Sequence, residues 1–151
     1  IKENPNYNYI IAPHELQHIS ALQKQTNALL FSKANNTNIR NNNVLIIDSI
    51  GILSNIYQYA NIAYIGGGFG AGIHNVLEAV AFGLPVIFGP NYQKFNEAKE
   101  LINQKGAISI SNYTELTSAI DCFSTFNKSI AINYIKENSG ATTKILDSII
   151  T

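Results

Sequence analysis

A glycine-rich stretch, Gly66 to Gly72, lies between a short apolar run and an apolar helical pattern. His74 and Asn75 follow it, and Glu78 comes three residues after Asn75. Glycines let a backbone approach a ligand closely and adopt positive φ without a Cβ penalty. The N–H groups at the start of the next helix attract anions. The pattern of strand, bare turn and helix start therefore predicts a site for a phosphate-bearing ligand.

A second motif overlaps this stretch. Gly66-x-Gly68-x-x-Ala71 formally satisfies the dinucleotide-binding fingerprint G-x-G-x-x-G/A. That fingerprint follows the first strand of its fold, whereas this one follows the fourth predicted strand. The next predicted strand ends in Phe88-Gly89-Pro90, without the acidic residue that would hold a ribose. The sequence therefore disfavours NAD(P) as the ligand.

Three polar side chains beside the turn have both structural and ligand-binding interpretations. Asn75 suits the N-cap of the following helix, and Glu78 has capping-box spacing from it. Glu78 also lies in the most apolar helical pattern of the chain. We therefore predict that its carboxylate accepts hydrogen bonds from sugar hydroxyls, with the cap as the alternative. A helix dipole favours neutral His74, which can then donate to a phosphate or sugar oxygen.

Six short apolar runs alternate with helical patterns along the chain. They are rich in Ile and Val and nearly continuous, as expected for strands covered on both faces. The predicted strands are Tyr9–Ala12, Ala28–Phe31, Val44–Ile47, Ile62–Ile65, Pro85–Phe88 and Ala107–Ile110. This alternation, with right-handed crossovers, predicts an α/β fold: a Rossmann-like parallel sheet with helices on both faces.

Polar or glycine-rich clusters follow four of the predicted strands. They are residues 13–15, 48–51, 66–75 and 89–91. Ligands of open parallel sheets bind at the carboxyl ends of the strands, so we expect the clusters to share one site. For Asp48, a turn cap and a loop-ordering role are both open. His14 and His18 are one turn apart, but no third ligand lies near them in sequence, which disfavours a metal.

The later part of the chain carries clear helix boundary signals. The fourth helical pattern stops at Gly106, which we predict as its C′ residue. Asn112 and Glu115 have capping-box spacing and predict the start of the next helix. After residue 126 only helical spacing remains, first around Tyr134 and then around Leu146.

These signals suggest a division of the chain. We expect a Rossmann-like domain of residues 1–126 and a helical tail of residues 127–151. The chain begins at Ile1 and contains no Met, so we also expect a piece of a longer protein, with a partner domain that holds part of the active site.

Composition narrows the class of protein. The 151 residues are 46% hydrophobic, enough for a sizeable core. The formal net charge is zero, so no global basic field points to nucleic acid or to an anionic membrane surface. No apolar run reaches the ~18 residues of a membrane span. The single cysteine, Cys122, excludes an internal disulfide and a cysteine metal cluster, and we expect a buried thiol.

Together the clusters resemble the C-terminal, donor-binding half of GT-B glycosyltransferases, and more narrowly the 3-deoxy-D-manno-octulosonic acid (Kdo) transferases. That half carries a Pro-basic segment, an Asp-[Ser/Thr]-x-Gly-x-Leu turn, a Gly-Gly run closing in Gly-x-His-Asn-x-Leu-Glu-Ala, and Pro-Val-x-x-Gly-Pro. The matching segments are Pro13-His14-Glu15, Asp48-Ser49-Ile50-Gly51-Ile52-Leu53, Gly66-Gly67-Gly68, Gly72-Ile73-His74-Asn75-Val76-Leu77-Glu78-Ala79 and Pro85-Val86-Ile87-Phe88-Gly89-Pro90. Many members have Arg at the position of His14 and Glu at that of Ile52.

The resemblance implies an activity for the whole enzyme. It would move Kdo from CMP-Kdo to a lipid A precursor in lipopolysaccharide inner-core synthesis, with inversion and without a cofactor or metal. The whole enzyme would be located at the cytoplasmic face of the bacterial inner membrane. The donor-binding residues that the resemblance implies are His14, Ser49, Gly51, Gly67, Gly68, Gly72, His74, Asn75 and Glu78.

The resemblance also implies what this chain lacks. The general base, the lipid acceptor site and the membrane contact belong to the family's N-terminal domain, which we expect to be absent here. We therefore expect a soluble fragment without a catalytic residue or a nucleic-acid partner. It would bind CMP or CMP-Kdo weakly and transfer nothing by itself.

Two other functions remain open from the sequence. One is the donor domain of another GT-B glycosyltransferase that uses a UDP-sugar. The other, from a different class, is a nucleotide-sensing or protein-binding Rossmann module without enzymatic activity. A preference for CMP over UDP separates the first from the Kdo assignment, and the effect of nucleotides on melting temperature tests the second.

Overall fold

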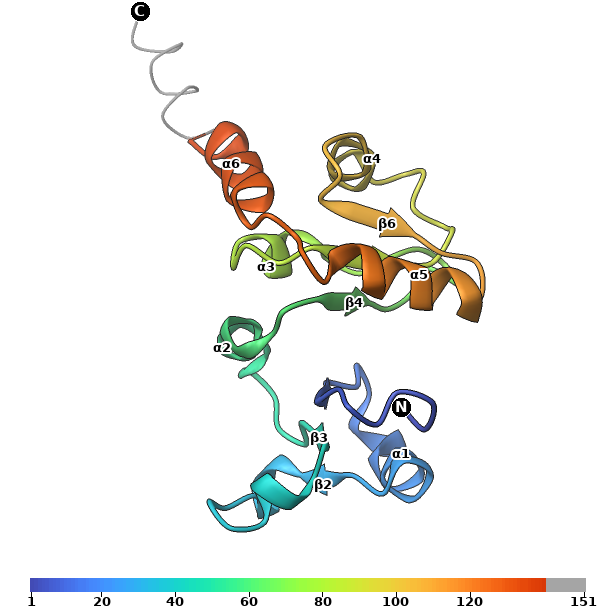
Figure 1. Cartoon of the computed structure of the whole chain (residues 1–151), viewed down its shortest axis with the longest axis vertical. Coiled ribbons are helices and arrows are strands. Elements are labelled where there is room, and N and C mark those ends of the chain that lie inside the picture. The colour runs from blue at the N-terminus through green and yellow to red at the C-terminus, as the bar shows by residue number, and fades with distance from the viewer. Residues whose placement is uncertain (141–151) are drawn as a thin grey trace, which may run out of the picture. The chain divides into compact units, whose positions relative to one another are not determined.

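The structure is a computed structural model that describes residues 1–140. The chain forms two compact units, one of residues 1–53 and the other beginning at Ser54, which we describe separately. Figure 1 shows the elements of both units. The helix predicted around Leu146 lies outside the described residues.

The first unit contains a three-stranded parallel sheet in the order β1-β3-β2. Its strands and helix are β1 (Tyr9–Ile11), α1 (Ile19–Thr26), β2 (Leu29–Leu30) and β3 (Val44–Ile46). Short 3₁₀ turns lie at Leu16–His18, Phe31–Lys33 and Ile39–Asn41. The core of this unit is small: Ala28, Val44 and Ile46 are buried, and apolar side chains of β1 and α1 pack against them.

The second unit contains another parallel sheet, in the order β4-β5-β6. Its strands are β4 (Ala63–Ile65), β5 (Val86–Phe88) and β6 (Ala107–Ser109). Its helices are α3 (Leu77–Val80), α4 (Asn96–Asn103), α5 (Tyr113–Phe123) and α6 (Ser129–Asn138). The short helix α2 (Leu53–Ile56) and the 3₁₀ turn Tyr57–Tyr59 come before β4. All six predicted strands are confirmed, and the α/β, Rossmann-like class with them.

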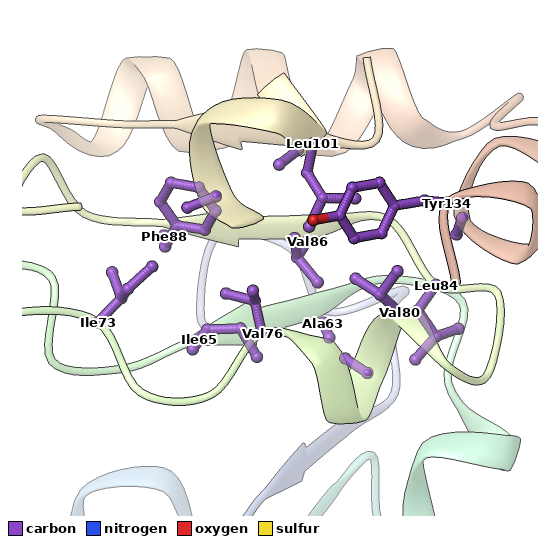
Figure 2. Close-up of a cluster of buried hydrophobic side chains, with 14 residues drawn as sticks. Ala63, Ile65, Ile73, Val76, Val80, Leu84, Val86, Phe88, Leu101 and Tyr134 are labelled. Carbon is purple, nitrogen blue, oxygen red and sulfur yellow. The ribbon is translucent and has the colours of Figure 1, made fainter. Parts of the chain in front are cut away.

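Side chains of the central strand β5 are buried on both faces of the second sheet. Val86 and Phe88 point into a cluster with residues of β4, α3, α4 and α6, which Figure 2 shows. Ile87, between them, points the other way and packs with Ile110 and with side chains of α5. Successive side chains of a strand alternate between faces, so a strand covered on both sides must be apolar at every position. This explains the unbroken apolar run that predicted β5.

Helix α6 belongs to the core of the second unit. Ala131 and Tyr134 are among the buried residues of the cluster in Figure 2. The Tyr134 hydroxyl donates to Oε2 of Glu100 on α4 at 2.7 Å. Burial together with this carboxylate raises the pKa of Tyr134 well above its ordinary value. The first helix predicted beyond residue 126 therefore closes one side of this core.

The end of α4 corrects one prediction by a residue. Lys105, not Gly106, has the left-handed conformation, with φ +61°. The Lys105 N–H donates to Ile102 O at 3.0 Å and the Gly106 N–H to Leu101 O at 2.8 Å, the two bonds of a Schellman motif. Gly106 is the residue after C′, where a Cβ would lie 3.3 Å from Leu101 Cδ2. Packing against Leu101, rather than positive φ, accounts for the glycine.

Helix α5 confirms one prediction and corrects another. Asn112 caps it, since its Oδ1 accepts the Glu115 N–H at 2.9 Å. Cys122, predicted to be buried, is exposed. The adjacent Phe123 takes the buried position instead, because neighbouring residues of a helix point about 100° apart and the larger apolar side chain faces the core.

No helix within residues 1–140 is long and apolar enough to cross a membrane.

Candidate functional site

The glycine turn follows β4 and is built on positive φ angles. Gly67 has φ +86° and Gly72 has φ +144°. The turn closes through the Gly70 N–H, which donates to Gly67 O at 2.8 Å, and the His74 N–H, which donates to Gly66 O at 3.1 Å. A Cβ on Gly67 would lie 2.3 Å from Gly72 O, so two parts of the turn touch where only glycine fits.

The same turn crosses the loop that follows β5. A Cβ on Gly68 would lie 2.6 Å from Gly89 N, and a Cβ on Gly89 would lie 2.6 Å from Gly68 C. The Asn91 N–H donates to Gly68 O at 2.9 Å, and Nδ2 of Asn91 donates to Gly70 O at 2.8 Å. The two glycine-containing loops therefore form one backbone-lined surface at the carboxyl ends of neighbouring strands.

Several N–H groups of the turn are left without an acceptor. Among residues 1–140, the backbone N–H groups of Gly67, Phe69 and Ala71 donate to no other residue. All three residues are exposed. Unpaired backbone N–H groups gathered in one turn are the donors from which anion-binding concavities are built. The geometry therefore supports the predicted phosphate site.

The helix after the turn is shorter than the apolar pattern predicted. α3 has only four residues, Leu77–Val80. Phe82 and Gly83 donate to the carbonyls three residues before them, which tightens the chain, and Gly83 ends it with φ +76°. One helical turn has a small dipole. The predicted attraction of the helix start for an anion is therefore small, and the unpaired N–H groups of the glycine turn are the stronger candidate for an anion site.

Asn75 and Glu78 contact each other at the start of α3. Oδ1 of Asn75 accepts the Leu77 N–H at 3.0 Å, and its Nδ2 donates to Glu78 Oε1 at 3.0 Å. The N-cap of α3 is Val76, which makes no side-chain cap bond, so the predicted N-cap role of Asn75 is wrong. Asn75 instead orders the turn just before the helix through its bond to the Leu77 N–H. Both side chains are exposed.

The chain contains a second Asn–Glu pair with the same spacing, at the start of α5. There Nδ2 of Asn112 donates to Glu115 Oε1 at 2.7 Å, and the second oxygen, Oε2, accepts the Ser111 N–H at 2.7 Å. Oε2 of Glu78 accepts no hydrogen bond within the described residues. Glu115 thus uses both oxygens in its cap, whereas one oxygen of Glu78 accepts no hydrogen bond within the described residues.

His74 lies between the glycine turn and α3. Its ring packs over Gly66: a Cβ at that position would lie 3.4 Å from His74 Cδ2. The side chain is exposed. The structure therefore brings six predicted site residues together in the second unit: Gly67, Gly68, Gly72, His74, Asn75 and Glu78.

The other three predicted site residues belong to the first unit. His14 is exposed and lies three residues after β1, and Ser49 and Gly51 lie in the turn after β3. Gly51 has φ +87°, and no atom lies within 4 Å of the position of a Cβ, so its glycine serves the turn. All three follow the carboxyl ends of adjacent strands of their own sheet.

Asp48 orders the loops of the first unit. Its Oδ1 accepts the Ser32 N–H at 2.9 Å, and its Oδ2 accepts the Ser32 hydroxyl. These bonds join the loop after β2 to the loop after β3, which selects the loop-ordering role over the turn cap. The hydroxyl bond is the main cause that lowers the pKa of Asp48 below its ordinary value.

This lowered pKa makes a prediction about Ser32. The unfolded chain binds a proton at Asp48 more readily than the folded chain, so the contribution of Asp48 to stability is present above its ordinary pKa and is lost as pH falls through the lowered one. Ser32→Ala should raise the pKa of Asp48 toward its ordinary value, as read from a carboxyl NMR titration. Ser49→Ala, which removes a nearby hydroxyl without a bond to Asp48, is the control. An unchanged Asp48 pKa in S32A would contradict the assignment.

The histidines of the first unit do not form a metal site with each other. His18 instead lies 3.2 Å from Glu15, between Nε2 and Oε2. Within residues 1–140 no group of three His, Cys, Asp or Glu residues is placed to hold a metal ion.

A shallow pocket of about 240 Å³ adjoins the glycine turn. Its lining residues are Gly70, Ala71, Asn91, Gln93, Lys94 and Phe95. Asn91 belongs to a strand-end cluster predicted from the sequence, whereas Gln93 and Lys94 were not predicted as site residues. Their signal is their place in the chain: they are polar residues directly after the Gly89-Pro90 turn, at the same end of the sheet as the glycine stretch.

Comparison with protein-family models gives no match. Curated relatives are found over most of the chain. The 3-deoxy-D-manno-octulosonic acid transferase of Aquifex aeolicus is 31% identical over 125 residues, which are 82% of this chain and 35% of that protein. The enzyme of the same name from Rickettsia prowazekii is 32% identical over 131 residues, 86% of this chain and 27% of that protein.

Other matches extend the comparison. A bifunctional glycosyltransferase/methyltransferase of Fusobacterium nucleatum is 29% identical over 91% of this chain and 25% of its own length. Among solved structures, the C-terminal CMP-Kdo binding domain of WaaA from Acinetobacter baumannii superposes with a TM-score of 0.69 at 14% identity, over 89% of this chain and 90% of that domain.

The chain spans about a third or less of the length of these curated relatives. The structural similarity to the Acinetobacter baumannii domain, in contrast, covers nearly all of this chain and nearly all of that domain. The sequence similarity and the shared fold agree with the resemblance found in the motifs. The chain is a relative of the 3-deoxy-D-manno-octulosonic acid transferases and has the fold of a C-terminal domain of that kind.

Proposed function

We propose that the chain is the donor-binding part of a Kdo transferase and that it holds CMP-Kdo. The observation that carries this proposal is the glycine turn, whose exposed N–H groups at Gly67, Phe69 and Ala71 have no acceptor within the described residues. Beside them, Glu78 keeps a free carboxylate oxygen. One anion-binding turn and one hydrogen-bond acceptor suit a sugar nucleotide with a single phosphodiester.

The turn binds the phosphate of the donor through its N–H groups. When the bond between the Kdo anomeric carbon and the phosphate oxygen breaks, negative charge grows on the departing CMP. Fixed N–H dipoles stabilise that charge without having to reorganise. Glu78 accepts hydrogen bonds from hydroxyl groups of the donor, and Asn75 holds the carboxylate in place through its 3.0 Å bond to Oε1.

The rest of the reaction lies with other parts of the protein. In this proposal the acceptor is a lipid A precursor, the anomeric centre is inverted, and no metal ion takes part. The matched residues make up only 35% and 27% of the two Kdo transferase relatives. We assign the general base, the acceptor site and contact with the bacterial inner membrane to the remaining length of such proteins.

A second candidate is the donor part of a glycosyltransferase that uses a UDP-sugar. The observation that favours this candidate is the Fusobacterium nucleatum relative, which is named as a glycosyltransferase/methyltransferase without mention of Kdo. The glycine turn would accept a diphosphate as well as a monophosphate. The nucleobase and the number of phosphates therefore decide between the two candidates.

Calorimetric titration of the chain with CMP, UMP and UDP tests the proposal. We expect CMP to bind about tenfold more tightly than UMP or UDP, which is about 1.4 kcal/mol. Tighter binding of UDP would contradict the Kdo assignment and favour the UDP-sugar candidate. If no nucleotide bound or raised the melting temperature, the non-enzymatic module would be favoured. The chain alone should transfer no Kdo from CMP-Kdo to a lipid A precursor, and transfer by it would contradict the division of roles.

A further inference from the structure

The pocket beside the glycine turn is formed by a loop that is fixed at both ends. At one end, Asn91 donates from its backbone to Gly68 O and from its side chain to Gly70 O. At the other end, the Phe95 ring packs on the turn: a Cβ at Gly72 would lie 3.0 Å from Phe95 Cε2. The segment between these anchors has little freedom to move away from the turn.

Internal contacts stiffen the same segment. The Tyr92 ring packs against Phe88 of β5, with centroids 5.4 Å apart. The Phe95 N–H donates to Tyr92 O at 2.9 Å, and Gln93 Nε2 donates to Pro90 O at 2.8 Å. Gln93 and Lys94 are therefore presented at a defined place beside Gly70 and Ala71, where all four line the pocket.

Lys94 is a cation at this place without an internal partner. Within residues 1–140 its ammonium group makes no hydrogen bond and no ion pair, and the side chain is exposed. Ala71, which lines the same pocket, has an unpaired backbone N–H. The pocket thus combines a positive charge and a fixed N–H donor, and none of its lining residues carries a carboxylate.

The size of the pocket limits what it can hold. About 240 Å³ is less than the ~300–1,000 Å³ of sites that enclose a whole drug-sized ligand. The pocket is therefore large enough for one end of a sugar nucleotide but not for the whole molecule. CMP-Kdo carries two anionic groups, the phosphodiester and the carboxylate of the sugar acid. The turn and the pocket offer two adjoining places for them.

We propose that Lys94, with the Ala71 N–H, binds the carboxylate of the transferred sugar and so selects a sugar acid over a neutral sugar. This inference rests on the proposed function. It goes further in naming the group that separates Kdo from the neutral sugars of other donors. Lys94 is a specificity-determining residue in this account, and the phosphate remains with Gly67 and Phe69.

The test compares CMP with freshly prepared CMP-Kdo on the wild-type chain and on Lys94→Gln. The wild-type chain should bind CMP-Kdo about tenfold more tightly than K94Q does. A loss of affinity of about tenfold is what the removal of one charge-assisted hydrogen bond is expected to cause. CMP, which lacks the sugar carboxylate, should bind both chains equally within about twofold. Lys94→Arg, which keeps the charge, should recover most of the affinity for CMP-Kdo.

Lys99→Gln is the matched control, because Lys99 is exposed on α4 and does not line the pocket. It should leave both affinities unchanged. If K94Q weakened CMP and CMP-Kdo equally, Lys94 would serve the phosphate and the carboxylate assignment would be overturned. An unaltered CMP-Kdo affinity in K94Q would overturn it as well. Failure of the wild type to bind either compound would instead refute the proposed function.

Discussion

Gly68→Ala should lower the free energy of unfolding by about 3 kcal/mol, and the melting temperature by about 6–12 °C. The added Cβ would lie 2.6 Å from Gly89 N and 2.8 Å from Gly89 Cα. Both are backbone atoms of the loop after β5, so no side-chain rotation can relieve the contact. The glycine turn and that loop would have to separate, and the hydrogen bonds from Asn91 to the turn would lengthen or break.

Gly70→Ala is the matched control for this substitution. It lies in the same turn, but its Cβ would meet nothing nearer than Gly67 O at 3.5 Å, an ordinary contact. We expect a change of less than about 1 kcal/mol. Urea or thermal unfolding of the two variants measures the difference. Equal stability of G68A and G70A would show that the two loops do not touch as described.

Glu78→Gln should weaken CMP binding by roughly 10- to 100-fold, with little effect on stability. A hydrogen bond from a ligand to a charged group contributes about 1.5–3 kcal/mol, and Glu78 has one carboxylate oxygen available for such a bond. The side-chain amide that E78Q introduces keeps an oxygen that can still accept from Asn75. Isothermal calorimetry with CMP gives the affinity, and the unfolding transition gives the stability.

The second Asn–Glu pair supplies the control. Glu115→Gln alters a side chain with the same spacing from its asparagine, but both of its oxygens are used in the cap of α5. It should lower stability by about 0.5–1 kcal/mol and leave CMP binding unchanged. Equal loss of affinity in both variants would mean that Glu78 acts through the fold and not on the ligand.

The strands and the loop glycines could be predicted because their causes are local. A strand buried on both faces must be apolar throughout, and β5 shows this at Val86, Ile87 and Phe88. A turn with positive φ requires glycine, as at Gly67. The capping signal at Asn112 is equally local, and the structure reproduces it.

The features that were missed depend on tertiary packing. Whether Cys122 or Phe123 faces the core is decided by the sheet beneath α5, not by the helix itself. The reason for glycine at position 106 is the nearby Leu101 side chain, whereas Lys105 adopts the strained conformation. The pocket residue Lys94 is positioned by bonds between two loops that are distant in sequence. None of these partners can be identified from the sequence pattern alone.

The shortness of α3 shows a different limit. The apolar spacing from Val76 to Ala81 fits a longer helix, yet only Leu77–Val80 is helical. Backbone bonds to the carbonyls three residues earlier and the positive φ of Gly83 end it. Periodicity shows which face is buried but not how many turns the chain completes. In the proposed function the phosphate is therefore attracted by the turn and not by a helix dipole.

Amide chemical-shift mapping with CMP tests the central claim most directly, because it shows where on the chain the nucleotide binds. The largest changes in the ¹⁵N-labelled chain should fall on residues 66–78, above all on the N–H groups of Gly67 and Phe69. The amides of α5, remote in sequence and capped by Asn112, should stay unchanged. Saturable binding of CMP that left the turn amides unmoved would contradict the account.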